Sequence, residues 1–202
     1  MKFDELLPVI INDNQLHARW LNTLSLMENT GARKISACED TETVTYIILN
    51  HAAEEHRHAF YLKKQIEKID KTACPTYSSG YLLAPASSKH YLNQLDVDVC
   101  RYLKKELELT GAELRFAAYL LVTYAIEVRA DELYPLYQDV LTGIKSTVNV
   151  KTIIAEEINH LHEMTEQLKA FSPDYQELCS VVCAIEKELF TDWIDAVKKE
   201  LF

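Results

Sequence analysis

The residues most suited to chemistry in this sequence are two copies of a Glu-x-x-His pattern, at Glu55 to His58 and at Glu157 to His160. Residues three apart lie on one face of a helix, so each pair can offer a carboxylate oxygen and an imidazole nitrogen to the same metal ion. Each copy is preceded by Ala-Glu. Two copies can arise by chance in a glutamate-rich chain, so their placement in the fold must decide what they mean.

The spacing of apolar residues predicts an all-α chain with four long helices. These helices are predicted over about 13–36, 43–70, 111–141 and 148–171. The residues between 70 and 109 form a long crossover, which is irregular at first because it contains prolines, glycine and serines, and then helical from about residue 88. A last helix is predicted over 173–202. We therefore expect one helical domain spanning residues 1–202.

Local signals place several helix ends. The segment Thr110-Gly-Ala-Glu113 has the form of a capping box and should open the third long helix. Pro135 predicts a kink in that helix, and Gly143 predicts its end. Ser172-Pro173-Asp174 supplies a cap, a first-turn proline and an acid for the last helix.

Composition argues against several classes of protein. The net charge is −10, and without a dense Lys/Arg cluster we expect no nucleic-acid surface. No apolar run is long enough to span a membrane, and the run Leu6 to Ile11, interrupted by Pro8, lacks the length and flanks of a signal peptide. The five cysteines are scattered and form no Cys-x-x-Cys pair. We expect reduced thiols and a cytoplasmic protein.

The geometry of two helical hairpins locates two further glutamates. If the first hairpin turns near residue 41, the residue opposite Glu55 is near 27 or 28, where Glu28 stands. If the second turns near residues 142 and 143, the residue opposite Glu157 is near 127 or 128, where Glu127 stands in an apolar stretch. Glu28 and Glu55 would both lie about 20 Å from their turn at about 1.5 Å per residue. The same arithmetic therefore brings one glutamate to each Glu-x-x-His pair.

Such a cluster requires a cation. A carboxylate among apolar neighbours is costly to bury unless it is paired or binds a metal, and four carboxylates with two imidazoles at one level would repel one another. The alternative is a metal-free bundle in which the same acids and histidines form a buried polar network, which is costly when only partly compensated. The sequence thus predicts two metal ions, held by Glu28, Glu55, His58, Glu127, Glu157 and His160.

The order Glu, Glu-x-x-His, Glu, Glu-x-x-His on successive helices resembles the ferritin-like di-iron carboxylate superfamily, which includes ferritins, rubrerythrins and di-iron oxygenases. The resemblance covers residues 13 to 171 apart from the crossover, and implies a ferritin-like four-helix bundle. It also implies that Glu55 and Glu157 bridge the two metals and that each histidine ligates one of them. The segment from Glu54 to His58 matches a form common in the oxygen-activating branch, whereas Asn159 departs from it in the second copy.

Residues beside the six ligands have two readings each. Glu54 and Glu156 occupy the position where family members use an acid to orient a ligand histidine, or they are solvated surface residues. His51, one turn before Glu55, shares its face and could support the ligands. Thr123 and Tyr124 lie one turn before Glu127 and are candidate catalytic residues that could line the metal pocket, although such residues are more often plain core.

The predicted ligands suit iron, with manganese as the alternative, better than copper or structural zinc. The leading hypothesis is a di-iron oxidoreductase that activates O2 to oxidise or hydroxylate an organic substrate in an apolar pocket. The crossover 70–109 would form a lid or wall of that pocket. Electrons would come from a separate donor, since the chain has no rubredoxin-like cysteines and no dinucleotide-binding glycine motif.

Two other classes of function use the same features. A ferroxidase or peroxide-reducing protein would employ the same ligands without an organic substrate. A helical interaction module would keep the fold without turnover. The sequence leaves the oligomeric state open, a homo-oligomer included.

Overall fold

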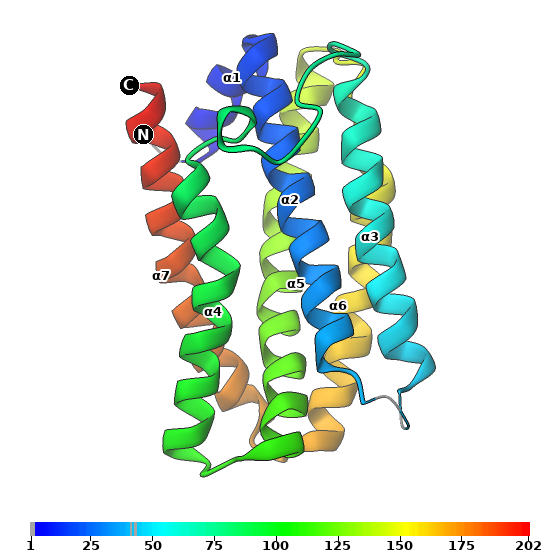
Figure 1. Cartoon of the computed structure of the whole chain (residues 1–202), viewed down its shortest axis with the longest axis vertical. Helices are drawn as coiled ribbons and strands as arrows, with labels where there is room; N and C mark the ends of the chain where they lie inside the picture. Colours follow the sequence, from blue (N-terminus) through cyan, green and yellow to red (C-terminus); the bar gives the residue numbers. More distant parts are fainter. Residues whose placement is uncertain (1–2, 41, 43) are drawn as a thin grey trace.

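A computed structural model describes residues 3–40, 42 and 44–202. Its regular elements within these residues are all helical, which confirms the predicted all-α class (Figure 1). They are α1 (Phe3–Asn12), α2 (Asn14–Cys38), α3 (Tyr46–Ile66), the 3₁₀ turn η1 (Ser79–Tyr81), α4 (Pro85–Glu106), α5 (Gly111–Gly143), α6 (Lys151–Phe171) and α7 (Tyr175–Leu201).

Two antiparallel hairpins organise the molecule: α2 packs along α3, and α5 packs along α6 (Figure 1). Between them the chain crosses one end of the molecule and returns along its length as α4, so that α3 and α5 run in the same direction. α4 also packs against α5 and α7. The helical part of the predicted crossover is therefore an integral part of the packed structure.

The ends of the first hairpin and the crossover differ modestly from expectation. The predicted start of the second helix at residue 43, and residue 41 of the predicted turn, lie outside the described residues. α3 begins at Tyr46, after Thr45, whose side chain accepts a hydrogen bond from the N–H of Ile48. It ends at Ile66, four residues before the predicted end. α4 begins three residues early because Pro85 occupies its first turn, where the missing N–H costs nothing.

The second hairpin corrects one capping prediction. Thr110 is the N-cap of α5, but its side chain makes no capping hydrogen bond, so the expected capping box is wrong. α5 contains Pro135 and ends at Gly143, the predicted stop, two residues beyond the predicted range. The kink at Pro135 stays a prediction. α6 begins at Lys151, three residues later than expected. The last helix begins at Tyr175, two residues later than expected, and its N-cap is Asp174, which makes no side-chain capping bond. The predictions of a cap at Ser172 and of a first-turn position for Pro173 are therefore wrong.

The helix α1 was not predicted. Its interior residue Pro8 removes one backbone hydrogen bond, which weakens any helical prediction from local sequence. Four of its apolar side chains are nevertheless buried: Leu6, Leu7, Ile10 and Ile11. Burial of several large side chains contributes more than one lost hydrogen bond, so tertiary packing decides the structure of this segment.

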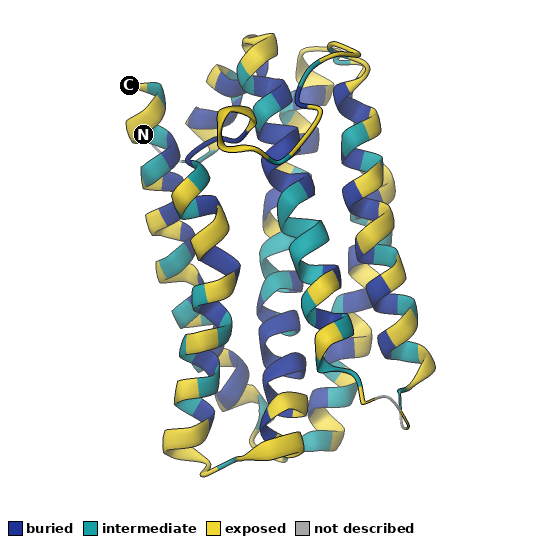
Figure 2. Cartoon of the chain, in the orientation of Figure 1, coloured by how far each residue is buried: buried dark blue, intermediate teal, exposed yellow. Residues whose placement is uncertain are grey.

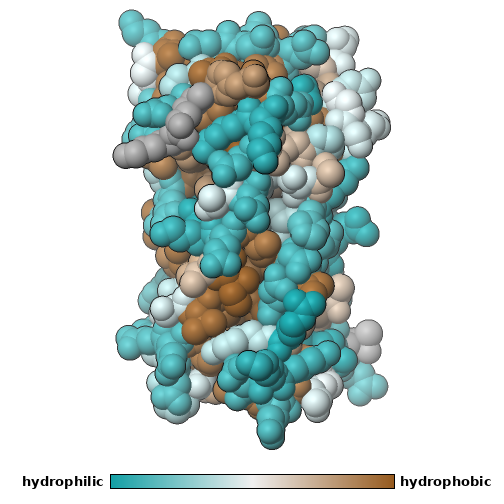
Figure 3. Space-filling view, turned by 90° about the vertical axis from the view of Figure 1, so that its left-hand side faces the viewer, coloured by the Kyte–Doolittle hydropathy of each residue, from teal (hydrophilic) through white to brown (hydrophobic). Residues whose placement is uncertain are grey.

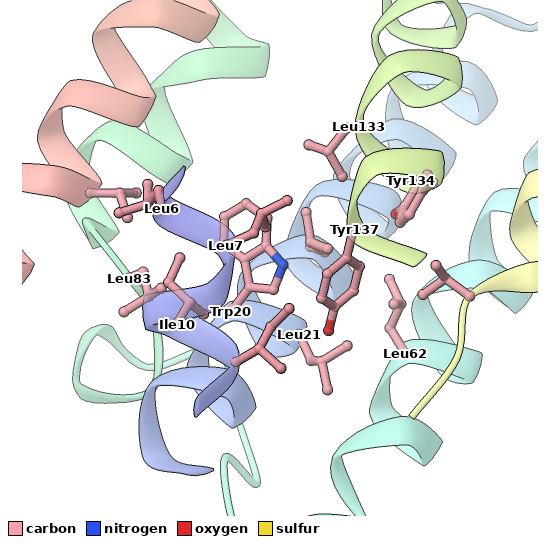
Figure 4. Packing of buried hydrophobic residues seen from close by; sticks show 14 of the residues in the cluster. Leu6, Leu7, Ile10, Trp20, Leu21, Leu62, Leu83, Leu133, Tyr134 and Tyr137 are labelled. Carbon is pink, nitrogen blue, oxygen red and sulfur yellow. The ribbon is translucent and has the colours of Figure 1, made fainter. Parts of the chain in front are cut away.

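Buried apolar residues form two clusters, which the inner, dark-blue faces of the helices in Figure 2 trace. The first cluster lies beside α1 and contains Trp20 and Tyr137, whose rings meet edge to face (Figure 4). Trp20 also stacks on Trp193, with ring centroids 5.6 Å apart. Four helices run from one cluster to the other: α2, α3, α5 and α6. The polar residues of the candidate site lie near the middle of these helices, between the two clusters.

The surface over α4 and α7 is mainly polar, although apolar side chains gather in the lower half of this face (Figure 3). On α4, Val97 is 47% exposed. None of the described helices is both long and apolar enough to span a membrane.

Candidate metal centre

All six predicted ligands meet in the middle of the bundle, between the two apolar clusters. Glu28 comes from α2, Glu55 and His58 from α3, Glu127 from α5, and Glu157 and His160 from α6. Together with His51 they form two groups in which the potential ligand atoms lie within 4.8 Å of one another. The first group is Glu28, Glu55, His58 and Glu157, and the second is His51, Glu55, Glu127 and His160.

In the first group the Nδ1 atom of His58 faces three carboxylates. It lies 3.1 Å from Oε1 of Glu157, 3.8 Å from Oε2 of Glu28 and 4.0 Å from Oε1 of Glu55. These oxygens come from three helices, so an ion at their centre would bind α2, α3 and α6 to one another.

In the second group the Nδ1 atom of His160 takes the corresponding position. It lies 3.6 Å from Oε1 of Glu55, 3.7 Å from Oε1 of Glu127 and 3.3 Å from Oε2 of Glu157. Glu55 belongs to both groups, and the two oxygens of Glu157 face the two different histidines. Glu55 and Glu157 therefore connect the two groups.

The centre is buried and electrostatically crowded. Burial raises the pKa of the Glu55 carboxyl well above its ordinary value, and the carboxyls of Glu28 and Glu157 raise it further. Burial also raises the pKa of Glu157, with Glu127 as the next cause. Without a metal, carboxyls at this spacing retain protons because like charges so close cannot all ionise.

The two histidines respond in the opposite way. Burial alone would lower the pKa of His58, but the carboxylates of Glu157 and Glu28 raise it to about 10. Burial likewise opposes protonation of His160, and Glu127 and Glu157 raise its pKa to about 11. In the absence of a metal, the protonated imidazoles thus supply positive charge among the carboxylates. A divalent cation bound at the same place would supply more positive charge.

Two buried polar atoms of the centre lack a hydrogen-bond partner among the described residues: Nδ1 of His58 and Oε2 of Glu127. Buried polar atoms are almost always paired, so each of these needs an explanation. A metal ion would satisfy both, and carboxylate and imidazole donors without thiolates are the set that iron or manganese prefers. The residues present therefore fit a metal ion.

The outer nitrogens of the two histidines are held across the hairpins. His160 donates from Nε2 to Oε2 of Glu54 at 2.7 Å, and His58 donates from Nε2 to Oε2 of Glu156 at 2.7 Å. Arg57 also donates to Glu156 at 2.7 Å. Since a carboxylate can only accept, each imidazole carries its outer proton and turns Nδ1 toward the centre. Of the two readings of Glu54 and Glu156, the structure favours the orienting one.

His51 lies inside the centre. Its Nε2 donates to Oε1 of Glu127 at 2.9 Å and lies 3.6 Å from Oε1 of Glu55. Burial lowers the pKa of His51 to about 4, so its ring is neutral at pH 7. A neutral ring with its proton on Nε2 positions the carboxylate of Glu127.

An apolar cavity of about 100 Å³ adjoins the centre. The ligands Glu28, Glu55 and Glu127 form part of its wall, and the rest comes mainly from side chains of α2, α4, α5 and α7. Tyr91 and Asp96 of α4 belong to this wall, so the helical part of the crossover borders the cavity. Its role as a lid or wall of a substrate pocket stays a prediction.

Thr123 lines this cavity, whereas Tyr124 is absent from its wall. Burial raises the pKa of Tyr124, and the nearby thiols of Cys179 and Cys183 on α7 raise it further. The structure therefore puts Thr123 beside the predicted ligands and turns Tyr124 away from them. Their catalytic roles stay predictions.

Two tyrosines at the centre gave no signal in the sequence. The hydroxyl of Tyr134 donates to Oε1 of Glu28, although the residues stand on different hairpins. Tyr119 lines the cavity, and its ring lies edge-on to that of His51. Tyr134 is two helical turns from Glu127, and Tyr119 slightly more than two in the other direction, so helical spacing from Glu127 was the one available clue.

Comparison of the chain with models of known protein families, with curated proteins and with solved structures finds no match.

Proposed function

We propose that this chain is a ferritin-like di-iron protein that uses O2 to oxidise or hydroxylate an organic substrate. The observation that carries the proposal is the pair of donor groups that share Glu55 and adjoin an apolar cavity. Two ions held side by side can act on one bound molecule, and the cavity gives an organic molecule a place within reach of them.

The arrangement of the helices supports the assignment to a ferritin-like bundle. In such bundles two antiparallel hairpins are joined by a long crossover, and each hairpin contributes one glutamate and one Glu-x-x-His pair. Here α2 with α3 and α5 with α6 contribute these residues, and α4 lies within the crossover. The directions of α3 and α5 agree with that connection (Figure 1).

When bound, two ferrous ions would supply the electrons that reduce O2. The residues of the chain would hold these ions: Glu28 and Glu127 would each bind one ion, and Glu55 and Glu157 would each contact both. Tyr134 holds a proton on the hydroxyl that faces Glu28, because burial and then that carboxylate raise its pKa. The apolar wall of the cavity would keep bulk water away from bound ions.

The first test is the metal content of the full-length protein. After anaerobic incubation with Fe(II) and desalting, we expect close to two iron ions per chain, with Mn(II) examined in parallel. Glu55→Ala and Glu157→Ala should each lose at least one ion, whereas Glu188→Ala on the exposed face of α7 should lose none. Wild-type protein that retains no metal would refute the proposal.

The second test separates oxygenase chemistry from iron handling. Iron-loaded protein given O2, a chemical electron donor and a panel of small organic compounds should consume O2 in step with an oxidised product. Oxidation of many Fe(II) per chain without any organic product would instead identify a ferroxidase. Reduction of peroxide with no need for O2 would identify a peroxide-reducing protein.

A further inference from the structure

The charged groups in the cavity wall are already paired. Besides the three ligand carboxylates, the wall contains Lys34, Asp96 and Arg129. Lys34 of α2 forms an ion pair with Asp96 of α4, at a partly exposed edge of the cavity. This pair leaves no cation of α2 or α4 in the wall to bind an acidic group.

The guanidinium of Arg129 already donates hydrogen bonds to carboxylates of the protein itself. Its Nε and Nη2 donate to the two oxygens of Glu186 at 2.9 and 2.7 Å, and its Nη1 donates to Glu132. Tyr91, also in the wall, donates its hydroxyl to the same Glu186. A guanidinium with two carboxylate partners has no net attraction left for an anionic substrate.

The charge of the metal centre is also balanced in the loaded state. Four carboxylates carry four negative charges, and two divalent ions would cancel them. With the ion pairs above, the loaded cavity would thus present an almost neutral interior. An uncharged molecule can enter such a site without leaving a bare charge behind, whereas a charged one cannot.

Besides Oε2 of Glu127, one polar atom of a wall residue lacks a hydrogen-bond partner within the described part of the chain. The hydroxyl of Tyr119 is buried and makes no hydrogen bond among the described residues, and the residue as a whole is 4% exposed. Burial and the nearby Glu127 raise its pKa, so the hydroxyl keeps its proton and can donate. Buried hydroxyls are nearly always paired, which makes this one a candidate for pairing with a ligand.

We propose that the cavity binds an uncharged, mainly apolar substrate with one neutral hydrogen-bonding group, which pairs with the hydroxyl of Tyr119. A cavity of about 150 Å³ holds benzene. The volume of about 100 Å³ here accepts the apolar end of a small molecule, and the remainder of the molecule would extend past the Lys34–Asp96 edge. This substrate class rests on the proposed function, but occupation of the cavity can be tested without metal.

The test uses the metal-free full-length protein and two probes of similar size, 1-pentanol and cyclopentane, with binding followed by methyl NMR. Both should bind. Tyr119→Phe should weaken pentanol three- to tenfold, as the loss of one hydrogen bond predicts, and leave cyclopentane unchanged. Tyr46→Phe is the matched control, because Tyr46 is 80% exposed. An unchanged pentanol-to-cyclopentane affinity ratio in Tyr119→Phe would overturn the role of Tyr119.

A filling variant locates the probes. Ala130 lines the cavity, so Ala130→Leu should abolish binding of both probes, and Ala184→Leu on the exposed face of α7 should not. Probe binding that survives Ala130→Leu would place the probes elsewhere and contradict the proposal.

The charge prediction is tested on protein loaded with redox-inert Zn(II), in which the carboxylates are neutralised. There 1-pentanol should bind at least tenfold more tightly than pentanoate, and equal or tighter binding of pentanoate would overturn the uncharged class. Failure of these probe experiments in protein that takes up two iron ions would remove the substrate class alone. Failure to take up iron would remove the proposed function, whatever the metal-free cavity binds.

Discussion

His160 of α6 donates from Nε2 to Glu54 of α3 at 2.7 Å, so each Glu-x-x-His helix orients the histidine of the other: Glu156 of α6 holds His58 of α3 in the same way. This exchange explains why both copies of the pattern begin with a second glutamate. It also couples the two hairpins, because moving one helix would turn a ligand that stands on the other. A contact of this kind fixes the ring and raises its basicity as a ligand.

We therefore expect Glu54→Ala and Glu156→Ala each to weaken metal binding by about 10- to 100-fold while sparing the fold. Glu54→Gln should have a smaller effect, since its amide oxygen still accepts from Nε2 of His160. Competition with a chelator of known affinity measures the change. The exposed Glu188→Ala serves as the control. Wild-type affinity in both alanine variants would show that these acids do not support the centre.

The residues that meet at the centre could be located from sequence because two regular features decide their positions. Helical spacing puts Glu55 beside His58, and the symmetry of a hairpin puts Glu28 opposite Glu55. Both features depend on local geometry and on chain length alone. The all-α class followed for a similar reason, since apolar spacing persists over many turns.

Other parts depend on contacts that spacing does not encode. The pairing of Arg129 with Glu186 requires α5 and α7 to be rotated toward each other, and Tyr134 reaches Glu28 across hairpins. The turning of Tyr124 toward α7 is a similar case. The sequence did not predict α1 because Pro8 weakens the local helical pattern. The helix is favoured by the burial of its apolar side chains against residues far along the chain, which local spacing does not reveal.

His51 and His160 should differ in their effect on stoichiometry. Nδ1 of His160 faces three carboxylates. The neutral ring of His51, by contrast, donates its one N–H to Glu127. We expect His160→Gln to lose one ion per chain and His51→Gln to retain both, with weaker binding of one. Metal analysis after desalting distinguishes the variants. If His51→Gln lost one ion per chain, His51 would itself be a metal ligand.

Gly31 offers a test of the space beside the ligands. It lies within α2, and a Cβ added there would meet Oε2 of Glu55 at 3.8 Å, an ordinary contact. Because glycine is about 1 kcal/mol less favourable than alanine in a helix, Gly31→Ala should raise the free energy of unfolding by about 0.5–1 kcal/mol in urea titrations. Gly111→Ala should lower it, since Gly111 has a φ of +58°. Destabilisation by Gly31→Ala would mean that the space is needed by the fold itself.

His17 should make the stability of the protein depend on pH. It is buried, and its Nε2 lies 2.6 Å from the hydroxyl of Tyr137; burial lowers its pKa from 6.5 to about 4. The unfolded chain therefore binds the proton more readily than the folded one. Stability from the neutral ring is complete above pH 6.5 and is lost as the pH falls toward 4, by an amount of about 3 kcal/mol. In urea titrations from pH 7 to pH 4, His17→Gln should lose less stability than the wild type by up to that amount. His90→Gln, at an exposed position, should follow the wild type, and equal pH slopes for all three proteins would show that His17 is not held neutral by the fold.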